Sequence, residues 1–410
     1  MTDYTKYLSP TGRQLHESAI RRMGTVVAKT ADLVSFAAGY PDPRLFPWDD
    51  LREIANELLA SKDGLVLQYG PTRGYKPLLE AILPVLEGRG ITATLDELMI
   101  TSGSQQGLDL VARVLISPGD AVLVELPAYT GAISAFKNAQ AHLVGVTQDD
   151  DGINLDDLDA VCQRERAAGR RVNLLYLVPN FQNPTGLLIG LDKRRQLLEW
   201  AERRDVLIVE DDPYGVLYFD DVASEAETRP IRADDATGRV IYLSTFSKTL
   251  APGFRVGWMV APAPLVERFE TAKQSIDLTS GIFDQRVVLE SIRRGVIDRL
   301  APQLRDLYRQ KRTVMEDALR AELGTRVTWP APRGGFFLWA RLPDGFDDET
   351  LLARALEQRL VFVIGSAFYV DGTGHDRIRL SFSAPPPERI KEGVRRLAGA
   401  LTPAAVARER

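Results

Sequence analysis

Short apolar runs alternate with amphipathic segments through the middle of the chain. The segments between the runs show helical periodicity, as in residues 193–204, where Leu197, Leu198 and Ala201 share one side. Strands that alternate with helices predict βαβ units and a mainly parallel sheet covered on both faces. The site of such a sheet usually lies beyond the carboxyl ends of its strands. The six runs that we interpret as strands are residues 97–101, 121–125, 172–178, 206–210, 240–244 and 256–260.

The pattern changes near Val287 and predicts a second, smaller α+β domain. Residues 284–323 form a long helical stretch in which only Gly295 and Pro302 are expected to introduce bends. We expect residues 1–45 to pack on this domain rather than to fold alone. Three predicted strands and a final helix complete it, at residues 336–340, 361–364, 378–382 and 387–401.

Composition narrows the classes of function. With 410 residues, of which 45% are apolar and 26% charged, the chain is long enough for two globular domains. The net charge of −5 leaves no basic excess to neutralise nucleic-acid phosphates. One cysteine and three scattered histidines make an internal disulfide impossible and a metal site unexpected. The N-terminus lacks the apolar run of a signal peptide and no segment is long enough to span a membrane, so we expect a cytoplasmic protein.

Polar motifs follow four of the predicted strands, and their coincidence is more informative than any one of them. Residues 102–107, SGSQQG, come after the first strand and begin a helix whose free N–H groups suit a phosphate. The alternative is an ordinary helix cap made by Ser102 or Ser104. Residues 183–186, NPTG, place an amide soon after the third strand, although this motif alone is typical of a turn.

The other two motifs carry a buried acid and an unusual lysine. Asp211, in the sequence DDPY, closes a buried strand and needs a partner such as a protonated pyridine nitrogen. A loop or helix-capping carboxylate is the alternative. Lys248, in the sequence STFSK, follows the next strand and can form an imine with an aldehyde cofactor, unless it is a surface lysine. Arg255 comes seven positions later and offers a fork that matches a phosphate.

The motifs SGSQQG, PAY, NPTG, DDPY, TFSK and GFRVG, in this order, resemble those of the class I/II aminotransferases, a fold type I family of pyridoxal-phosphate enzymes. The resemblance covers about residues 36–401. Residues 39–47 (GYPDPRLFP), residues 68–75 (QYGPTRGY) and the double Asp of DDPY resemble the 2-aminoadipate and kynurenine aminotransferase branch. The resemblance implies an α/β fold whose large domain, residues 46–290, has a mainly parallel seven-stranded sheet covered by helices. Residues 1–45 and 291–410 would form the smaller α+β domain.

The resemblance also implies how a cofactor, pyridoxal 5′-phosphate (PLP), would be held. Lys248 would bind it as a Schiff base and shuttle the proton between Cα and the cofactor's C4′. Asp211 would pair with the pyridine nitrogen, while Asn183 and Tyr214 would hydrogen-bond the phenolic oxygen. Tyr129 would stack on the ring, although its motif alone is also compatible with a core tyrosine. The phosphate would be held by Ser104, Gln105, Thr245, Ser247 and Arg255, and by Tyr69 of a second subunit, which implies a homodimer with shared sites.

For the substrate, the resemblance implies that Arg379 clamps the α-carboxylate and that Gly39 lines the same end through its backbone. Strand alternation puts Arg377 and Arg379 on one face, so the pattern does not separate them, and the RLSF context favours Arg379. Asn183 and Tyr40 are further expected substrate contacts. By position, the candidate contacts of the substrate side chain are Arg21, Arg22, Tyr40, Leu45 and Ser280–Phe283.

We therefore expect a PLP-dependent aminotransferase (EC 2.6.1) that moves an amino group from an amino acid to a 2-keto acid by a ping-pong Schiff-base mechanism, with 2-oxoglutarate as the expected acceptor. Neither nucleic acid nor a membrane is an expected partner. Two alternatives stay open. The same site can serve elimination, replacement, decarboxylation or oxidation of an amino acid. An aminotransferase-like domain can also serve as an effector sensor behind a DNA-binding domain, but the roughly 35 residues before Phe36 are too few for such a domain.

Overall fold

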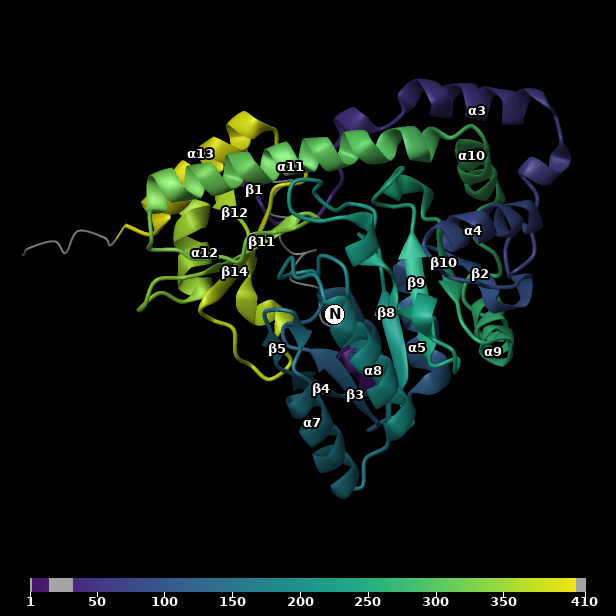
Figure 1. Cartoon of the computed structure of the whole chain (residues 1–410), viewed down its shortest axis with the longest axis horizontal. Coiled ribbons are helices and arrows are strands. Elements are labelled where there is room, and N and C mark those ends of the chain that lie inside the picture. Colours follow the sequence, from purple (N-terminus) through teal and green to yellow (C-terminus); the bar gives the residue numbers. More distant parts are fainter. Residues whose placement is uncertain (1, 15–31, 403–410) are drawn as a thin grey trace, which may run out of the picture.

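The computed structural model describes residues 2–14 and 32–402 (Figure 1). Within these residues, a seven-stranded sheet forms the centre of the larger part of the molecule, with the strand order β2-β10-β9-β8-β7-β3-β4. β10 is antiparallel to both of its neighbours, and the other pairs are parallel. Every strand except β10 therefore ends at the same edge. The strands are β2 (Leu98–Thr101), β3 (Ala121–Glu125), β4 (His142–Val146), β7 (Val172–Leu177), β8 (Leu207–Asp211), β9 (Val240–Thr245) and β10 (Gly257–Val260).

The predicted mainly parallel sheet is confirmed, and each of the six apolar runs is a strand. The seventh strand, β4, was not among the runs. It lies at the sheet edge and is only partly buried, and its sequence HLVGV begins with an exposed His142 and contains Gly145. An edge strand needs fewer apolar residues than a central one, so its run was too weak to be recognised.

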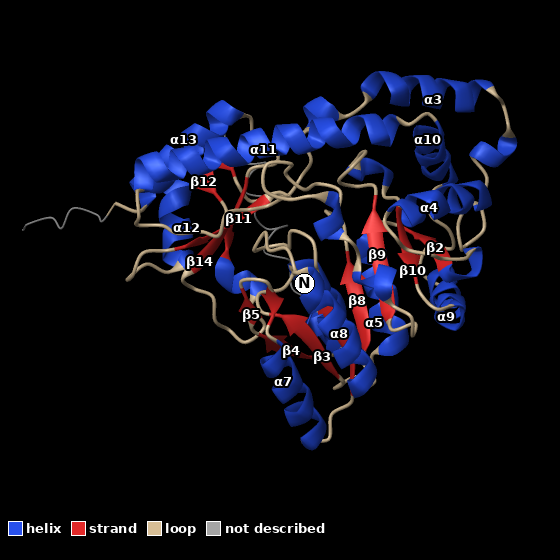
Figure 2. Cartoon of the chain, viewed as in Figure 1, coloured by secondary structure: helices blue, strands red, loops and turns tan. Residues whose placement is uncertain are grey.

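Helices cover both faces of this sheet (Figure 2). Along β3, Val122 and Val124 belong to the apolar cluster that also contains residues of α5, α6 and α9, whereas Ala121 and Leu123 belong to the cluster with residues of α7 and α8. This alternation follows from the two-residue period of a strand, and it explains why the central strands are apolar on both sides. The helices of this part are α3 (Trp48–Ala60), α4 (Lys76–Gly88), α5 (Ser104–Leu115), α6 (Thr130–Asn138), α7 (Leu155–Ala167), α8 (Leu191–Arg204), α9 (Ala263–Gln274) and α10 (Ile282–Arg293).

The smaller part contains an antiparallel sheet of order β11-β14-β13 and the parallel pair β1–β12. The run 361–364 divides between the two sheets, because Val361 pairs with Ser35 whereas Val363 pairs with Arg379. The strands are β1 (Val34–Ser35), β11 (Phe337–Arg341), β12 (Leu360–Val361), β13 (Val363–Ile364) and β14 (Arg377–Ser381), and the helices are α11 (Val296–Leu323), α12 (Asp348–Glu357) and α13 (Pro387–Ala400). The short hairpin of β5 (Gln148–Asp149) and β6 (Gly152–Ile153) packs on the larger part, where Ile153 is buried with residues of α7 and α8, and α1 (Pro10–Gln14) lies near the start of the chain.

The long helical stretch near residue 300 breaks once. Gly295 adopts a left-handed conformation with φ 64° between α10 and α11, as expected for a glycine at a helix junction. Pro302, the second expected bend, lies within α11, which continues through it to Leu323. In Figure 1 this helix spans the molecule from α10 to the smaller part.

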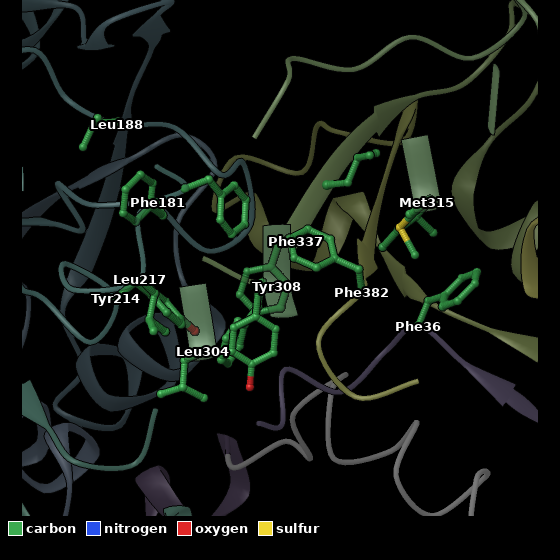
Figure 3. Close-up of a cluster of buried hydrophobic side chains, with 14 of the residues drawn as sticks. Phe36, Phe181, Leu188, Tyr214, Leu217, Leu304, Tyr308, Met315, Phe337 and Phe382 are labelled. Carbon is green, nitrogen blue, oxygen red and sulfur yellow. The ribbon is translucent and has the colours of Figure 1, made fainter. Parts of the chain in front are cut away.

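One apolar cluster joins the two parts behind the carboxyl edge of the sheet. It includes Tyr214 and Phe181 from the larger part and Tyr308, Phe337 and Phe382 from the smaller part (Figure 3). Burial of such side chains stabilises a fold by about 1.5–3 kcal/mol each, so the two parts share a substantial common core. Among the described residues, no helix is long and apolar enough to cross a membrane.

Candidate active site

A cavity of about 400 Å³ lies at the carboxyl edge of the large sheet, a volume typical of small-molecule sites. Loops that follow β2, β3, β7, β8 and β9 contribute to its wall, together with β11, β14 and the segment at residue 40. The parallel strands explain this convergence, since residues far apart in sequence leave the sheet at one edge. The predicted site residues that line the cavity are Gly39, Tyr40, Ser104, Gln105, Tyr129, Asn183, Asp211, Tyr214, Thr245, Ser247, Lys248, Arg255 and Arg379.

Asp211 forms one side of the cavity at the end of β8. Its Oδ2 accepts a hydrogen bond of 3.1 Å from the Tyr176 hydroxyl, while its buried Oδ1 has no hydrogen-bond partner among the described residues. Burial, together with the adjacent charge of Asp212, raises the pKa of Asp211 to about 7, against the lowering influence of the Tyr176 and Ser104 hydroxyls and of Lys248. A buried carboxylate oxygen with no donor is costly, so this atom is placed to accept a proton-bearing group of a ligand.

Lys248 follows β9 and extends into the same cavity. Its Nζ donates a hydrogen bond of 3.0 Å to the Gly39 carbonyl. Burial, together with the positive charges of Arg255 and Arg379, lowers the pKa of the amine to about 8, against the charge of Asp211, which raises it. A larger fraction of this amine is therefore neutral near pH 7 than is the case for an exposed lysine, and the neutral form is the nucleophile.

Hydroxyl groups and a guanidinium gather at another end of the cavity. The Arg255 guanidinium donates 3.3 Å to the Ser247 Oγ and 3.1 Å to the Ser102 carbonyl, and the Thr245 hydroxyl donates 2.8 Å to Ser247. The alternative in which Ser102 or Ser104 caps α5 is wrong. The N-cap is Gly103, at φ 73°, and it makes no side-chain cap hydrogen bond. The first N–H groups of α5 are thus available to an anion, which suits a phosphate.

Arg379 on β14 has an unusual environment for a buried cation. Its side chain is 1% exposed, and its guanidinium lies 4.3 Å from the ring centre of Phe337 and 5.2 Å from that of Phe368. It donates 2.7 Å to Asn183 Oδ1 and also donates to the Ala37 carbonyl, but no carboxylate of the described residues pairs with it. Burial lowers its pKa to about 10, so it stays a cation at neutral pH. A buried cation without an anion favours a carboxylate ligand.

The structure distinguishes Arg377 from Arg379 on β14, which the alternation of residues along the strand could not do. Arg377 is half-buried, and its Nε lies 3.4 Å from the Asp376 carboxylate. Only Arg379 lines the cavity.

Several cavity residues were absent from the predicted set. Phe337 packs its ring so closely on the segment at residue 39 that a Cβ on Gly39 would lie 2.6 Å from it, which explains the glycine. Tyr176, which lies beneath the cavity, carries no motif and reads in sequence as an ordinary strand residue. The remaining lining residues are Thr130, Gly131, Ser134, Val178 and Pro213.

Other predicted contacts do not reach the cavity. The Tyr69 side chain is 78% exposed and is absent from its lining, as are Leu45 and residues 280–283. Arg21 and Arg22 lie outside the described residues.

Comparison with known proteins decides the family. A family profile described as Aminotransferase class I and II matches residues 31–397. The chain belongs to the class I and II aminotransferases. It is 40% identical to aromatic-amino-acid aminotransferase 1 of Thermococcus litoralis over 97% of this chain and 94% of that protein.

Solved structures agree with this assignment. Kynurenine aminotransferase of Pyrococcus horikoshii, crystallised with PMP, is 38% identical and superposes with a TM-score of 0.91 over 97% of this chain and 98% of that one. An alpha-aminoadipate aminotransferase of Thermus thermophilus, complexed with N-(5′-phosphopyridoxyl)-L-leucine, is 37% identical with a TM-score of 0.87 over 98% of both chains.

The aminotransferase therefore uses PLP, and its substrates are amino acids and keto acids. The residues of the cavity fit this cofactor. A half-buried amine with a lowered pKa suits its aldehyde, and the unpaired Oδ1 of Asp211 suits its ring nitrogen. The hydroxyl groups around Arg255 and the start of α5 suit its phosphate.

Proposed function

We propose that Lys248 is the residue that joins PLP covalently. The observation that carries this proposal is the position of its half-buried amine in the same cavity as the unpaired carboxylate oxygen of Asp211. Asn183 and Tyr214 bind the phenolic oxygen, and Tyr129 stacks on the ring. Asn183 Oδ1 already accepts a hydrogen bond from Arg379, so the Asn183 Nδ2 is the atom oriented for that oxygen. The phosphate is bound by Ser104, Gln105, Thr245, Ser247 and Arg255.

Borohydride reduction followed by peptide mass mapping tests the attachment point. Reduction fixes the cofactor on whichever lysine holds it. We expect the added mass on the peptide that contains Lys248. A label on Lys273 or Lys311, the fully buried lysines elsewhere in the described residues, would contradict the assignment.

When bound, PLP supplies an electron sink for the substrate carbon that loses its proton. The protein moves that proton with Lys248, whose Nζ is neutral when it is not joined to the cofactor. The Gly39 carbonyl accepts a hydrogen bond from this Nζ and can orient it. Asp211 holds a proton on the ring nitrogen as an ionised carboxylate, and the Tyr176 hydroxyl fixes its orientation. Gly39 and Tyr40 line the cavity together with Arg379.

The lowered pKa of Lys248 predicts the pH dependence of cofactor capture. Below its pKa the amine is protonated and unreactive, and above it the amine is neutral. The rate at which the cofactor-free chain takes up PLP should therefore rise with pH through about 8, rather than near the 10.5 of an ordinary lysine. Stopped-flow absorbance measures this rate, with a free lysine derivative as the control for the pH dependence of PLP itself. A midpoint near that of the control would contradict the prediction.

We propose that Arg379 binds the α-carboxylate of the substrate, because it is a buried cation that lacks an anionic partner. Replacing Arg379 with Met should lower kcat/KM by about 30-fold or more, since truncating one partner of a buried ion pair costs about 2–5 kcal/mol. Most of the change should be in KM for amino acid and keto acid alike. Arg377→Met on the same strand is the matched control and should change kcat/KM less than about twofold. Equal effects of both variants would contradict the role of Arg379.

We propose transamination by a ping-pong sequence with 2-oxoglutarate as the acceptor. The relatives that carry the name aminotransferase support transamination, and the acceptor follows from the sequence resemblance alone. An amino donor added without a keto acid should convert the bound cofactor to its amine form, visible by absorbance, and 2-oxoglutarate should restore it. Release of ammonia or carbon dioxide without that conversion would favour elimination or decarboxylation instead.

We propose that the enzyme is a homodimer in which Tyr69 reaches the phosphate in the partner's site. Apolar side chains are exposed around Tyr69, with Leu65 63% and Leu67 76% exposed, which is unusual for a surface that stays in water. Light scattering should give twice the mass of the 45.5 kDa chain. Tyr69→Phe should weaken PLP binding without changing that mass, whereas a monomer with full activity would exclude shared sites. We further propose a domain division at residues 46–290 against 1–45 with 291–410, and a cytoplasmic location.

A further inference from the structure

The loop that leads into α5 is held from behind by polar side chains that have no place in the reaction described above. Five residues provide them, and we call these the loop clamp: Ser102, Gln106, Lys273, Asp277 and Ser280. Gln106 lies on α5, Lys273 lies near the end of α9, and the other members lie in the connections beside them, and none of the five lines the cavity.

Lys273 is the centre of the loop clamp. Its side chain is 0% exposed, and its ammonium group donates 3.0 Å to Gln106 Oε1, 2.6 Å to Asp277 Oδ1 and 3.1 Å to Ser280 Oγ. These three acceptors use all three donors of the ammonium group. A buried ammonium group with a full set of partners holds those partners in one arrangement, because moving any of them leaves a buried N–H donor without an acceptor.

Gln106 transmits this arrangement to the loop. Its Oε1, which accepts from Lys273, also accepts 2.8 Å from the Ser102 N–H, and its Nε2 donates 2.7 Å to Asp277 Oδ2. The Lys273 cation thus fixes which end of the amide faces Ser102. Ser102 is held at its other polar groups as well, since its hydroxyl donates 3.0 Å to Asp277 and its carbonyl accepts 3.1 Å from Arg255.

The next residue of the loop is a glycine, which depends on its surroundings for a fixed conformation. Gly103 adopts φ 73°, and glycine has access to many other conformations. The loop also packs tightly against β10, where a Cβ on Gly257 would lie 2.9 Å from the Gly103 Cα. Ser104 and Gln105 follow directly and line the cavity. Their N–H groups bind an anion best when the loop is already in place, because no ordering cost is then added to binding.

We propose that Lys273 is a positioning residue for the phosphate loop, residues 102–105: by fixing the Gln106 amide it fixes Ser102, and so directs the first N–H groups of α5 at the cofactor phosphate. This inference rests on the proposed role of Ser104 and Gln105. Lys273 acts on the loop through hydrogen bonds and not by attracting the phosphate charge directly. Its ammonium group lies 2.6 Å from the Asp277 carboxylate, which balances its charge locally.

The test measures phosphate binding separately from catalysis. Inorganic phosphate is titrated by calorimetry into the cofactor-free chain, and loss of PLP from the loaded enzyme is followed by absorbance after dilution. Lys273→Met retains the aliphatic stem and removes the donors. Gln106→Met breaks the same link while Lys273 keeps Asp277 and Ser280. Lys193→Met is the matched control, since Lys193 is also a largely buried lysine, paired with Asp149 and Asp151 far from the loop in sequence.

We expect both loop-clamp variants to raise the dissociation constant for phosphate by about tenfold, which corresponds to about 1.4 kcal/mol. PLP should dissociate faster by a similar factor, while kcat at saturating PLP changes by less than about threefold. Lys193→Met should lower the melting temperature without changing phosphate binding.

Phosphate binding within twofold of the wild type in a folded Lys273→Met or Gln106→Met variant would overturn the inference. If Lys273→Met does not fold, Gln106→Met alone decides, because it leaves no buried charge unpaired. Failure of the wild-type chain to bind PLP at Lys248 would instead overturn the proposed function, so the two failures are distinguishable.

Discussion

Replacement of Lys248 by alanine should abolish measurable turnover. The variant loses both the amine that joins the cofactor and the group that moves the substrate proton, and general acid–base catalysis alone accounts for about 10²–10⁴-fold in rate. PLP should still bind, since Asp211 and the phosphate contacts remain, but it should be removable by dialysis and should not be fixed by borohydride. The measurement is steady-state turnover together with the absorbance spectrum of the bound cofactor.

Lys193→Ala is the control for this variant, because it removes a largely buried lysine that pairs with Asp149 and Asp151 instead of lining the cavity. It should retain wild-type turnover. A Lys248→Ala enzyme with a wild-type spectrum and turnover would show that another amine does the chemistry.

Replacement of Asp211 by asparagine should have the second largest effect. Asparagine has nearly the same shape but is neutral, so it no longer holds a proton on the ring nitrogen and the cofactor becomes a weaker electron sink. Loss of a preorganised charge at a reacting centre typically lowers kcat by about 10²–10³-fold. The isotope effect with substrate deuterated at Cα should increase as well, because proton removal then limits the rate. Turnover with deuterated and ordinary substrate measures both quantities.

Asp212→Asn is a sharp control because the two acids are adjacent and both buried. Asp212 does not line the cavity and instead accepts hydrogen bonds from Asn180, Arg89 and Tyr242. Its charge raises the pKa of Asp211, so its removal lowers that pKa and keeps Asp211 ionised. We expect a less stable enzyme whose isotope effect is unchanged. A larger loss of kcat in Asp212→Asn than in Asp211→Asn would reverse the two roles.

Not all of the site could have been found from motifs. Three aromatic residues contact the side chains of the site but look like ordinary core residues in the sequence. Phe337 on β11 and Phe368 before β14 pack on Arg379, and Tyr176 on β7 donates a hydrogen bond to Asp211. The loop clamp is a similar case, since Lys273 lies 167 residues from Gln106 and belongs to a segment of ordinary helical pattern. Contacts of this kind depend on packing between distant elements, about which local periodicity carries no information.

The sequence was enough to predict the six central strands and most of the residues that line the cavity, because strand burial and the order of polar motifs are local properties of the chain. Tertiary structure alone decided that Arg379 rather than Arg377 faces the cavity, that Gly103 and not a serine is the N-cap of α5, and that the edge strand β4 exists. The physical reason is that burial, the lowered pKa of Lys248 and the unpaired oxygen of Asp211 all arise from surroundings that the folded chain assembles from separate segments.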